Sequence, residues 1–334
     1  MRKIFSLSFL VVLSFTLVAC TIVDDTKNYP ETVTITQTIT HATSSTDTNK
    51  TNETVDEVIP TNPKNVAIFD FGVLDILDSI GMDELGIENL AIVKSNVPSY
   101  LSKYNVDSTT NAGTLFEPNF DNLDLFSPDL VIISSRSAWT YDKLKSELGG
   151  VAVLNVSVNN AKYLESVVNN LSNLKQIFGG LEAFDSMIST LESKTSEVKT
   201  LAQNSALKAL IVMTNGDDIS GYGICSRFGF IHNELGFLAA DANFGNGDAN
   251  THGDIISFEY IQTLNPDVIF IVDRAAAIGG EASIGVLDNA LVNSTNAAKN
   301  DRMILLDSIA WYIVSGGYQS TLTMINDVKT LFVS

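Results

Sequence analysis

The chain has 334 residues, of which 45% are hydrophobic, so it is long enough to bury a core that is spread over two lobes or domains. Its formal net charge of −19 at pH 7 argues against nucleic acid or an anionic membrane surface as the main partner. An arginine placed in a pocket of such an acidic protein therefore stands out.

Residues 1–20 have the pattern of an export signal. Arg2 and Lys3 form a positive start, and residues 4–18 form an apolar stretch that is short and serine-rich for a transmembrane helix. The ending Leu-Val-Ala-Cys resembles a bacterial lipobox, which implies cleavage before Cys20 and lipidation of its sulfur. The mature charge would then be −19 minus 2, or −21. The alternative is a signal peptide or membrane span with an incidental cysteine.

Residues 21–60 are rich in Thr, Asp, Asn and Ser and contain scarcely an aromatic side chain. Such a composition buries too little apolar surface to offset the entropy lost on ordering. We therefore expect a disordered tether that lifts a folded domain off the membrane.

From residue 61 onward, buried strands alternate with helical segments. Apolar residues at helical spacing over roughly residues 181–203 predict one helix about 35 Å long. The pattern predicts an α/β fold with two α/β lobes, 61–180 and 205–334, a connecting helix over 181–204, and a ligand cleft between the lobes. The strands are expected in the segments KNVAIFDF, DLVIISS, VAVLNVS, ALKALIVMT, DVIFIVD and MILLDS.

One phrase occurs twice in the chain. FDNLDLFSPDLVIISSR, residues 120–136, aligns without a gap on FEYIQTLNPDVIFIVDR, residues 258–274, with the same residue at five of seventeen positions. Each copy reads as a helix, a Pro-Asp turn, a buried strand and an arginine at the strand's carboxyl edge, where open α/β sheets bind ligands. Arg136 and Arg274 are thus candidate ligand-binding residues. The alternative is a surface arginine that follows each strand.

Further candidates gather near the second copy. Arg227 precedes an apolar helix in CSRFGFIH, and His252 lies in a Thr-His-Gly turn. Trp311 and Tyr312 precede a glycine turn in IAWYIVSGG. Each also has an ordinary interpretation, as a capping arginine, a loop histidine or core aromatics.

Together these features resemble the solute-binding lipoproteins of ABC importers for iron siderophores and vitamin B12, the class III periplasmic-binding-protein family. The segments SRFGFIHNELG, THGDIISFEYIQTLNPDVIFIVDR, LDNALV and WYIVSGG are similar to those of the subgroup that binds ferric catecholate siderophores of the enterobactin and petrobactin type. The likeness covers residues 61–334 and is strongest in the C-terminal half. It implies a binding protein without catalysis or cofactor, whose ligand is an iron(III)–siderophore complex.

The resemblance also implies roles for single residues. Arg136, Arg227 and Arg274 would contact the anionic catecholate oxygens. His252 and Tyr312 would fill the last two iron positions when the siderophore is tetradentate. Trp311 would form an apolar wall of the pocket.

The resemblance further implies the protein's partners. Asp121 and Glu259, one acid in each lobe, would pair with arginines of an ABC permease. The expected protein is an extracytoplasmic monomer that is held to the cell membrane by the lipid on Cys20 and binds no nucleic acid.

The chemistry of the ligand agrees with these roles. Iron(III) is a hard cation that prefers oxygen donors, and its catecholate complexes are anions. Arginine offers a permanent charge and a planar fork of donors for such oxygens.

Several other functions are open from the sequence. A haem-binding lipoprotein of the same fold could use a tyrosine and a histidine as axial ligands. A zinc or manganese receptor is disfavoured, because only His232 and His252 lie outside the expected tether. A hydrolase is disfavoured because no G-x-S-x-G motif occurs. The repeat and the arginines argue against a purely structural or adhesive surface protein.

Overall fold

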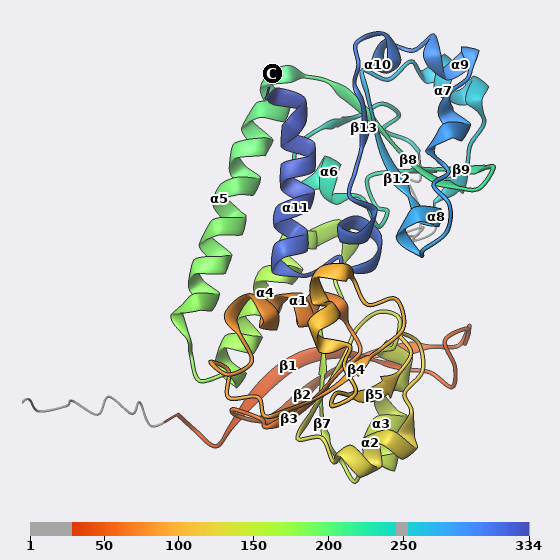
Figure 1. Cartoon of the computed structure of the whole chain (residues 1–334). Coiled ribbons are helices and arrows are strands. Elements are labelled where there is room, and N and C mark those ends of the chain that lie inside the picture. The colour runs from red at the N-terminus through yellow and green to blue at the C-terminus, as the bar shows by residue number, and fades with distance from the viewer. Residues whose placement is uncertain (1–28, 245–252, 334) are drawn as a thin grey trace, which may run out of the picture.

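The computed structural model describes residues 29–244 and 253–333. Figure 1 shows two lobes, one above the other, each built on one β-sheet with helices packed around it. The predicted fold class, two α/β lobes, is confirmed. No described helix is long and apolar enough to cross a membrane. Cys20 lies outside the described residues.

The lower lobe in Figure 1 has a parallel five-stranded sheet in the order β5-β4-β3-β6-β7. The central strands are short runs of Val, Ile, Leu and Ala that are buried on both faces, as expected for a parallel sheet covered by helices. Its strands are β3 (Asn65–Ile68), β4 (Asn89–Val93), β5 (Thr110–Gly113), β6 (Leu130–Ile133) and β7 (Ala152–Asn155). Its helices are α1 (Phe71–Ile80), α2 (Phe120–Phe126), α3 (Tyr141–Glu147) and α4 (Tyr163–Ile177).

The upper lobe has a mixed sheet in the order β11-β9-β8-β12-β13, with β10 also paired to β8. Strands β8, β12 and β13 are parallel, whereas β9 pairs antiparallel with β8 and β11 pairs antiparallel with β9. The strands are β8 (Lys208–Asn215), β9 (Asp218–Tyr222), β10 (Leu238–Ala239), β11 (Asp254–Ile255), β12 (Val268–Asp273) and β13 (Met303–Leu305). The helices are α6 (Phe230–Asn233), α7 (Phe258–Leu264), α8 (Arg274–Ala277), α9 (Ala290–Asn293) and α10 (Asn296–Lys299).

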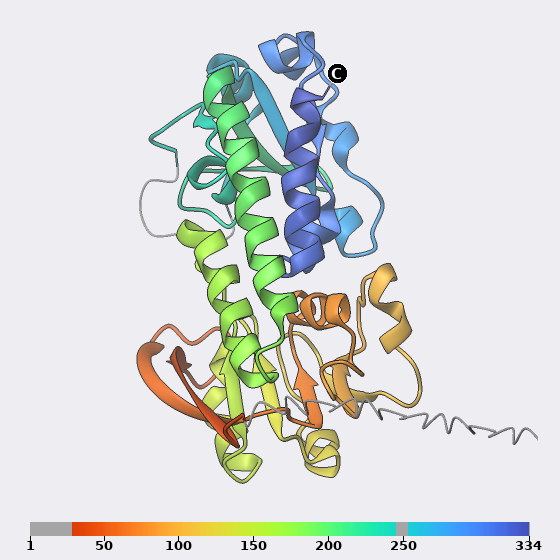
Figure 2. The same cartoon turned by 90° about the vertical axis from the view of Figure 1, so that its left-hand side faces the viewer.

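Helix α5 (Glu182–Ser205) runs along one side of both lobes, and α11 (Tyr318–Lys329) lies beside its upper part. Figure 2 shows α5 beside α11. At 1.5 Å per residue the 24 residues of α5 span about 36 Å. One apolar stripe of α5 is buried, and a single hydrophobic core continues from the lower lobe past this helix into the upper lobe. The lobes therefore share a core on the side of α5 and α11.

The prediction of a disordered tether over residues 21–60 is wrong for residues 32–60. They form an antiparallel hairpin of β1 (Thr32–His41) and β2 (Thr51–Pro60). The polar composition hid the strands: in β1 every second residue is a threonine that faces solvent, while the residues between them are β-branched or long enough to pack. Ile35, Ile39 and Ile59 are at most 2% exposed.

The hairpin packs against β7, the edge strand of the lower sheet, through side chains that replace a neighbouring strand. The Gln37 amide donates to the Val153 carbonyl oxygen at 2.7 Å and accepts the Asn155 N–H at 2.8 Å. The Glu57 carboxylate accepts the Val153 N–H at 3.2 Å and pairs with Lys145 at 2.7 Å. These contacts satisfy an edge that would otherwise expose its backbone.

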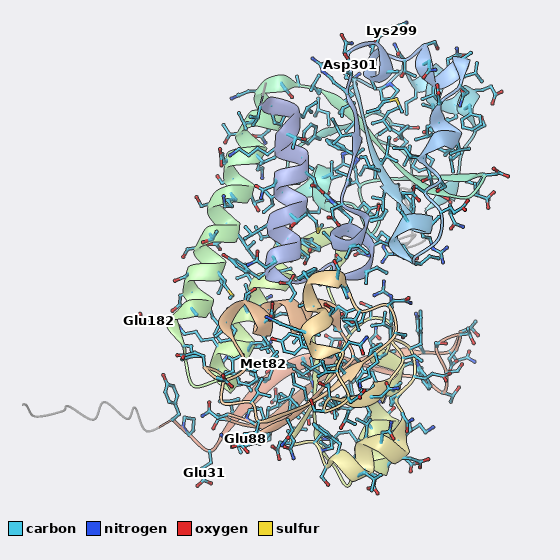
Figure 3. All side chains as sticks on the ribbon, in the orientation of Figure 1. Glu31, Met82, Glu88, Glu182, Lys299 and Asp301 are labelled. Carbon is cyan, nitrogen blue, oxygen red and sulfur yellow. The ribbon has the colours of Figure 1, made fainter. Side chains whose placement is uncertain are left out.

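Acidic side chains are exposed on the outer surface of both lobes. Figure 3 labels several charged side chains that are exposed at the periphery, among them Glu31, Glu88, Glu182 and Asp301. The positive charges that matter for the site lie elsewhere, at the inner ends of the strands.

Candidate ligand-binding site

The two copies of the repeated phrase have the same local structure. Helices α2 and α7 begin at the capping side chains of Asn119 and Ser257, which accept backbone N–H groups of the first turn. Both helices end at a residue in the left-handed region, Ser127 with φ 50° and Asn265 with φ 47°. The strands β6 and β12 follow at once, so the repeat is structural as well as sequential.

The Pro-Asp turn ties each strand to its neighbour. The Asp129 carboxylate accepts the N–H groups of Lys64 and Asn65, both at 2.8 Å, where β3 begins. The Asp267 carboxylate accepts the N–H of Lys208 at 3.1 Å, where β8 begins. The repeated aspartate thus fixes where each central pair of strands starts.

Arg274 directly follows β12 and is held by its own lobe. Its Nε donates to the Tyr312 hydroxyl at 2.8 Å, and its Nη1 donates to the Asn215 side-chain oxygen at 2.8 Å. The preceding Asp273 does not pair with it. That carboxylate accepts the N–H groups of Ser283 and Ile284 at 2.6 and 3.1 Å and so holds the following loop.

Arg136 reaches the same tyrosine from the other lobe. It lies half-buried in the turn after β6, and its Nη2 donates to the Tyr312 carbonyl oxygen at 2.8 Å. The two residues are 176 positions apart in the chain. This hydrogen bond therefore joins the lobes at the inner ends of their sheets.

Arg227 completes the group. Its guanidinium carbon lies 4.4 Å from the centre of the Tyr312 ring, within the range of a cation–π contact. Burial lowers the pKa of the Arg227 side chain, and the like charge of Arg136 lowers it further. An arginine stays protonated despite such a shift, so the site keeps three positive charges.

Tyr312 sits where the three arginines meet. It belongs to a single π-helical turn, Ile309–Ile313, a type of irregularity that is frequent at functional sites. Burial raises the pKa of its phenol, but the hydrogen bond from Arg274 and the charges of Arg227, Arg274 and Arg136 together hold that pKa below its ordinary value. The site therefore favours a negative charge on, or next to, this oxygen.

The sequence interpretation missed Asn215. It is the last residue of β8, the strand next to β12, so its side chain lies at the same edge as Arg274. A polar residue at the carboxyl end of a neighbouring strand is the signal that could have found it.

The predicted position of Trp311 is wrong. Its side chain is 1% exposed, its indole N–H donates to Asp327 at 3.0 Å, and its ring packs beside Phe228 and Phe230. Because Tyr312 is the next residue on a helical turn, the two side chains point in different directions. Trp311 supports the site from the core and forms no wall of a pocket.

The remaining predicted residues lie apart from the arginines or outside the described part. Asp121 and Glu259 are exposed in the first turns of α2 and α7, and within the described residues neither side chain makes a hydrogen bond or ion pair. His252 and Cys20 are not among the described residues. In residues 29–244 and 253–333, no group of three or more His, Cys, Asp or Glu is placed to hold a metal ion.

Residues 67–310 match the model of the periplasmic binding protein family. The chain belongs to this family. This periplasmic binding protein is accordingly a binding protein and not an enzyme, as the sequence interpretation predicted.

Three similar proteins have names that state which ligands they bind. The petrobactin-binding protein YclQ of Bacillus subtilis is 36% identical over 81% of this chain and 83% of its own length. Its crystal structure superposes with a TM-score of 0.76, covering 90% of this chain and 99% of YclQ. The ferric-anguibactin-binding protein FatB of Vibrio anguillarum is 32% identical, with 81% and 83% covered. The catecholate-siderophore binding protein VctP of Vibrio cholerae is 30% identical with a TM-score of 0.76, covering 89% and 100%.

Proposed function

We propose that this periplasmic binding protein captures a ferric catecholate-type siderophore outside the cytoplasmic membrane and delivers it to an ABC permease for iron uptake. The observation that carries the proposal is the meeting of three arginines from two lobes around one phenol. In a chain of net charge −19, this cluster is a local positive site. It suits a compact anion that is bound from both sides.

The donor set fits a chelated iron as cargo. Guanidinium groups donate in a planar fork to anionic oxygens such as those of catecholates. The Tyr312 phenol, whose pKa is below its ordinary value, can supply a hard oxygen to iron(III) when the chelator leaves positions open. His252 is the expected second donor from the protein. The names of YclQ, FatB and VctP, which all refer to siderophores, support this class of ligand.

The proposal includes an anchor and a partner. Lipidation at Cys20 would hold the monomer to the outer face of the membrane, close to the permease. Asp121 and Glu259 are both exposed in a first helical turn, one in each lobe, where a basic side chain of the permease could reach them. This arrangement supports docking through both lobes at once.

A titration of protein fluorescence tests the ligand class. The ligands are ferric petrobactin, a ferric triscatecholate, a ferric hydroxamate and haemin, each with its iron-free form as a control. We expect saturable quenching by the two ferric catecholates and weaker or no quenching by the hydroxamate. If the protein bound haemin and none of the ferric siderophores, the ligand would be haem and the proposed ligand class would be wrong.

A second experiment tests Tyr312 as an iron ligand. We expect Tyr312→Phe to shift the charge-transfer absorption of a bound tetradentate ferric catecholate, because one oxygen donor to iron is lost. A hexadentate triscatecholate is the matched control, since its iron has no open position. An unchanged tetradentate spectrum removes Tyr312 from the iron ligands.

A further inference from the structure

Two exposed aliphatic side chains accompany the two acids of the repeat. Among the large hydrophobic residues at positions 29–244 and 253–333, the most exposed are Leu125 at 87% and Ile255 at 81%. Leu125 lies four residues after Asp121, and Ile255 lies four residues before Glu259. Single exposed hydrophobic residues are common on protein surfaces, but here the two most exposed ones both lie next to the repeat-related acids.

We propose that each lobe docks on the permease through a pair of side chains, an acid and an aliphatic anchor, Asp121 with Leu125 and Glu259 with Ile255. The inference rests on the proposed function and adds the aliphatic half of the contact. The partner that fits this surface is the extracytoplasmic face of the permease. For each lobe, that face would carry a basic group beside an apolar hollow.

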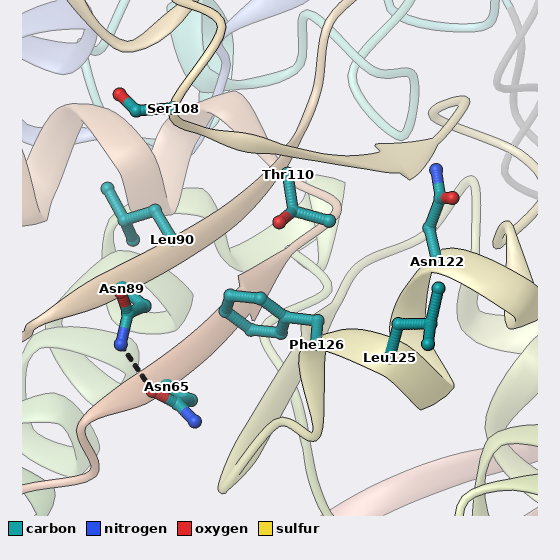
Figure 4. Close-up of a pocket in the computed structure, with 8 residues that line it drawn as sticks. All are labelled: Asn65, Asn89, Leu90, Ser108, Thr110, Asn122, Leu125 and Phe126. Atoms are coloured by element: carbon teal, nitrogen blue, oxygen red, sulfur yellow. Dashed lines mark hydrogen bonds between the residues drawn. The ribbon is translucent and has the colours of Figure 1, made fainter.

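In the lower lobe, helix geometry brings the two side chains together. Asp121 and Leu125 are four positions apart on α2, so they lie on one face of the helix about one turn apart. Figure 4 shows Leu125 beside a surface hollow of about 440 Å³. The amides of Asn65, Asn89 and Asn122 and the ring of Phe126 line it. A partner side chain next to Leu125 would thus find both apolar and hydrogen-bonding surface.

In the upper lobe, the alternation of side chains along a strand explains why Ile255 is exposed. Ile255 ends β11, which pairs with β9 as an edge of the sheet. The next residue, Ile256, is 8% exposed, and because neighbouring side chains of an extended chain point to opposite sides, Ile255 must face outward. The chain then enters α7 at the capping residue Ser257, two positions before Glu259. An isoleucine on an exposed sheet edge is a liability unless a partner covers it.

The charge of the possible partners favours one of them over the others. An anionic lipid surface or a second copy of this chain, at −19, would place negative charge against Asp121 and Glu259. A partner with basic groups avoids that repulsion. Because one pair lies in each lobe, a partner built from two related subunits can meet both.

The two halves of each pair should act differently. Exposed charges mainly raise the association rate in a salt-dependent way, whereas buried apolar anchors mainly slow dissociation. Loss of the acids should therefore matter less at high salt, and loss of Leu125 and Ile255 should matter equally at all salt concentrations.

The test compares three variants of the full-length chain, the doubles Leu125→Ser/Ile255→Ser and Asp121→Ala/Glu259→Ala, and Val58→Ser. Val58 is the matched control, since it is 58% exposed but lies on β2 of the hairpin. Each variant replaces the wild-type chain in cells that lack their own copy of the gene. The uptake of radioactive iron is measured from the ferric catecholate that the wild type binds. Fluorescence titration and circular dichroism on the purified variants report ligand affinity and folding.

We expect Leu125→Ser/Ile255→Ser to lower uptake about tenfold or more, with ligand affinity, fold and the Val58→Ser control unchanged. Uptake at the wild-type rate would overturn this inference and leave the proposed function standing. Failure of the wild type to bind any ferric catecholate would instead overturn the proposed function. A wild-type dimer in sedimentation that the double variant loses would assign the surface to self-association and also overturn the inference.

Discussion

Arg274 and Arg136 end the two copies of the same repeated unit, yet the structure holds them by different means. Arg274 donates to Asn215 and to the Tyr312 hydroxyl, all within the upper lobe. Arg136 donates to the Tyr312 carbonyl oxygen, across the gap between the lobes. One arginine is therefore positioned by its own lobe, and the other depends on how the two lobes meet.

The lengths of the strands explain this difference. Strand β12 continues through Asp273, so Arg274 emerges directly at the edge of the sheet. Strand β6 ends at Ile133, and Arg136 follows in a turn that is held by the side chains of Ser134 and Ser137. The repeat thus supplies one arginine as part of the upper site and a second that can act as a contact between the lobes.

The largest effect should come from removing the arginine that its own lobe holds. We expect Arg274→Ala to weaken binding of a ferric catecholate by about a thousandfold, because it removes a charge from the half-buried site and leaves the Tyr312 hydroxyl without its donor. Arg136→Ala should cost about tenfold, since its hydrogen bond forms only where the lobes meet.

Fluorescence titration of both variants measures these affinities. Arg302→Ala is the control, because Arg302 precedes β13 and so lies at the opposite edge of the same sheet. Equal losses for Arg274→Ala and Arg136→Ala would show that the two copies contribute alike, against the difference in their contacts.

A second contact between the lobes should make stability depend on pH. Asp75 of α1 is fully buried and accepts the N–H groups of Gln319 and Ser320, at 3.0 and 2.8 Å, at the start of α11. Burial raises the pKa of its carboxyl to about 6, although these hydrogen bonds act in the opposite direction. Between pH 4 and 6 the folded state binds more protons than the unfolded state, so stability falls as the pH rises.

Asp75→Asn should remove this dependence. The wild type should lose about 2 kcal/mol of unfolding free energy, relative to the variant, between pH 4 and pH 6. Urea denaturation across this range measures both curves. Parallel curves for the two proteins would mean that Asp75 does not titrate there and that the contact is insensitive to pH.

Much of the site could be predicted from the sequence because the pattern that marks it is local. The Pro-Asp phrase fixed a turn, a strand and the position of an arginine, and these follow from a few neighbouring residues. The family resemblance then gave ligand-binding roles to Arg227 and Tyr312, and the contacts of Tyr312 with Arg227 and Arg274 join distant parts of the chain. That meeting of residues could not be derived from spacing.

The errors had physical causes of their own. The hairpin was missed because polar composition outweighed the period-two alternation of Thr with Val and Ile, which is the stronger signal for a half-buried strand. Trp311 was misplaced because two adjacent aromatics on an irregular helical turn cannot both face the ligand, and the sequence does not show which one turns inward.

The smallest expected effect is a difference in stability between the two Pro-Asp turns. Asp129 accepts two backbone N–H groups at 2.8 Å, whereas Asp267 accepts one at 3.1 Å together with the Asn296 amide at 3.4 Å. We expect Asp129→Ala to lower the free energy of unfolding by about 1–2 kcal/mol and Asp267→Ala by roughly half of that.

Urea unfolding compares these variants directly, since one hydrophobic core continues through both lobes and should report them in a common transition. Asp124→Ala, which removes an exposed acid of the same helix as Asp121, is the control for the lost charge alone. If Asp267→Ala lowered the free energy of unfolding more than Asp129→Ala, the number and length of these hydrogen bonds would not be what stabilises the turns. The proline and the left-handed residue before it would then be the parts of the repeat that fix where each strand begins.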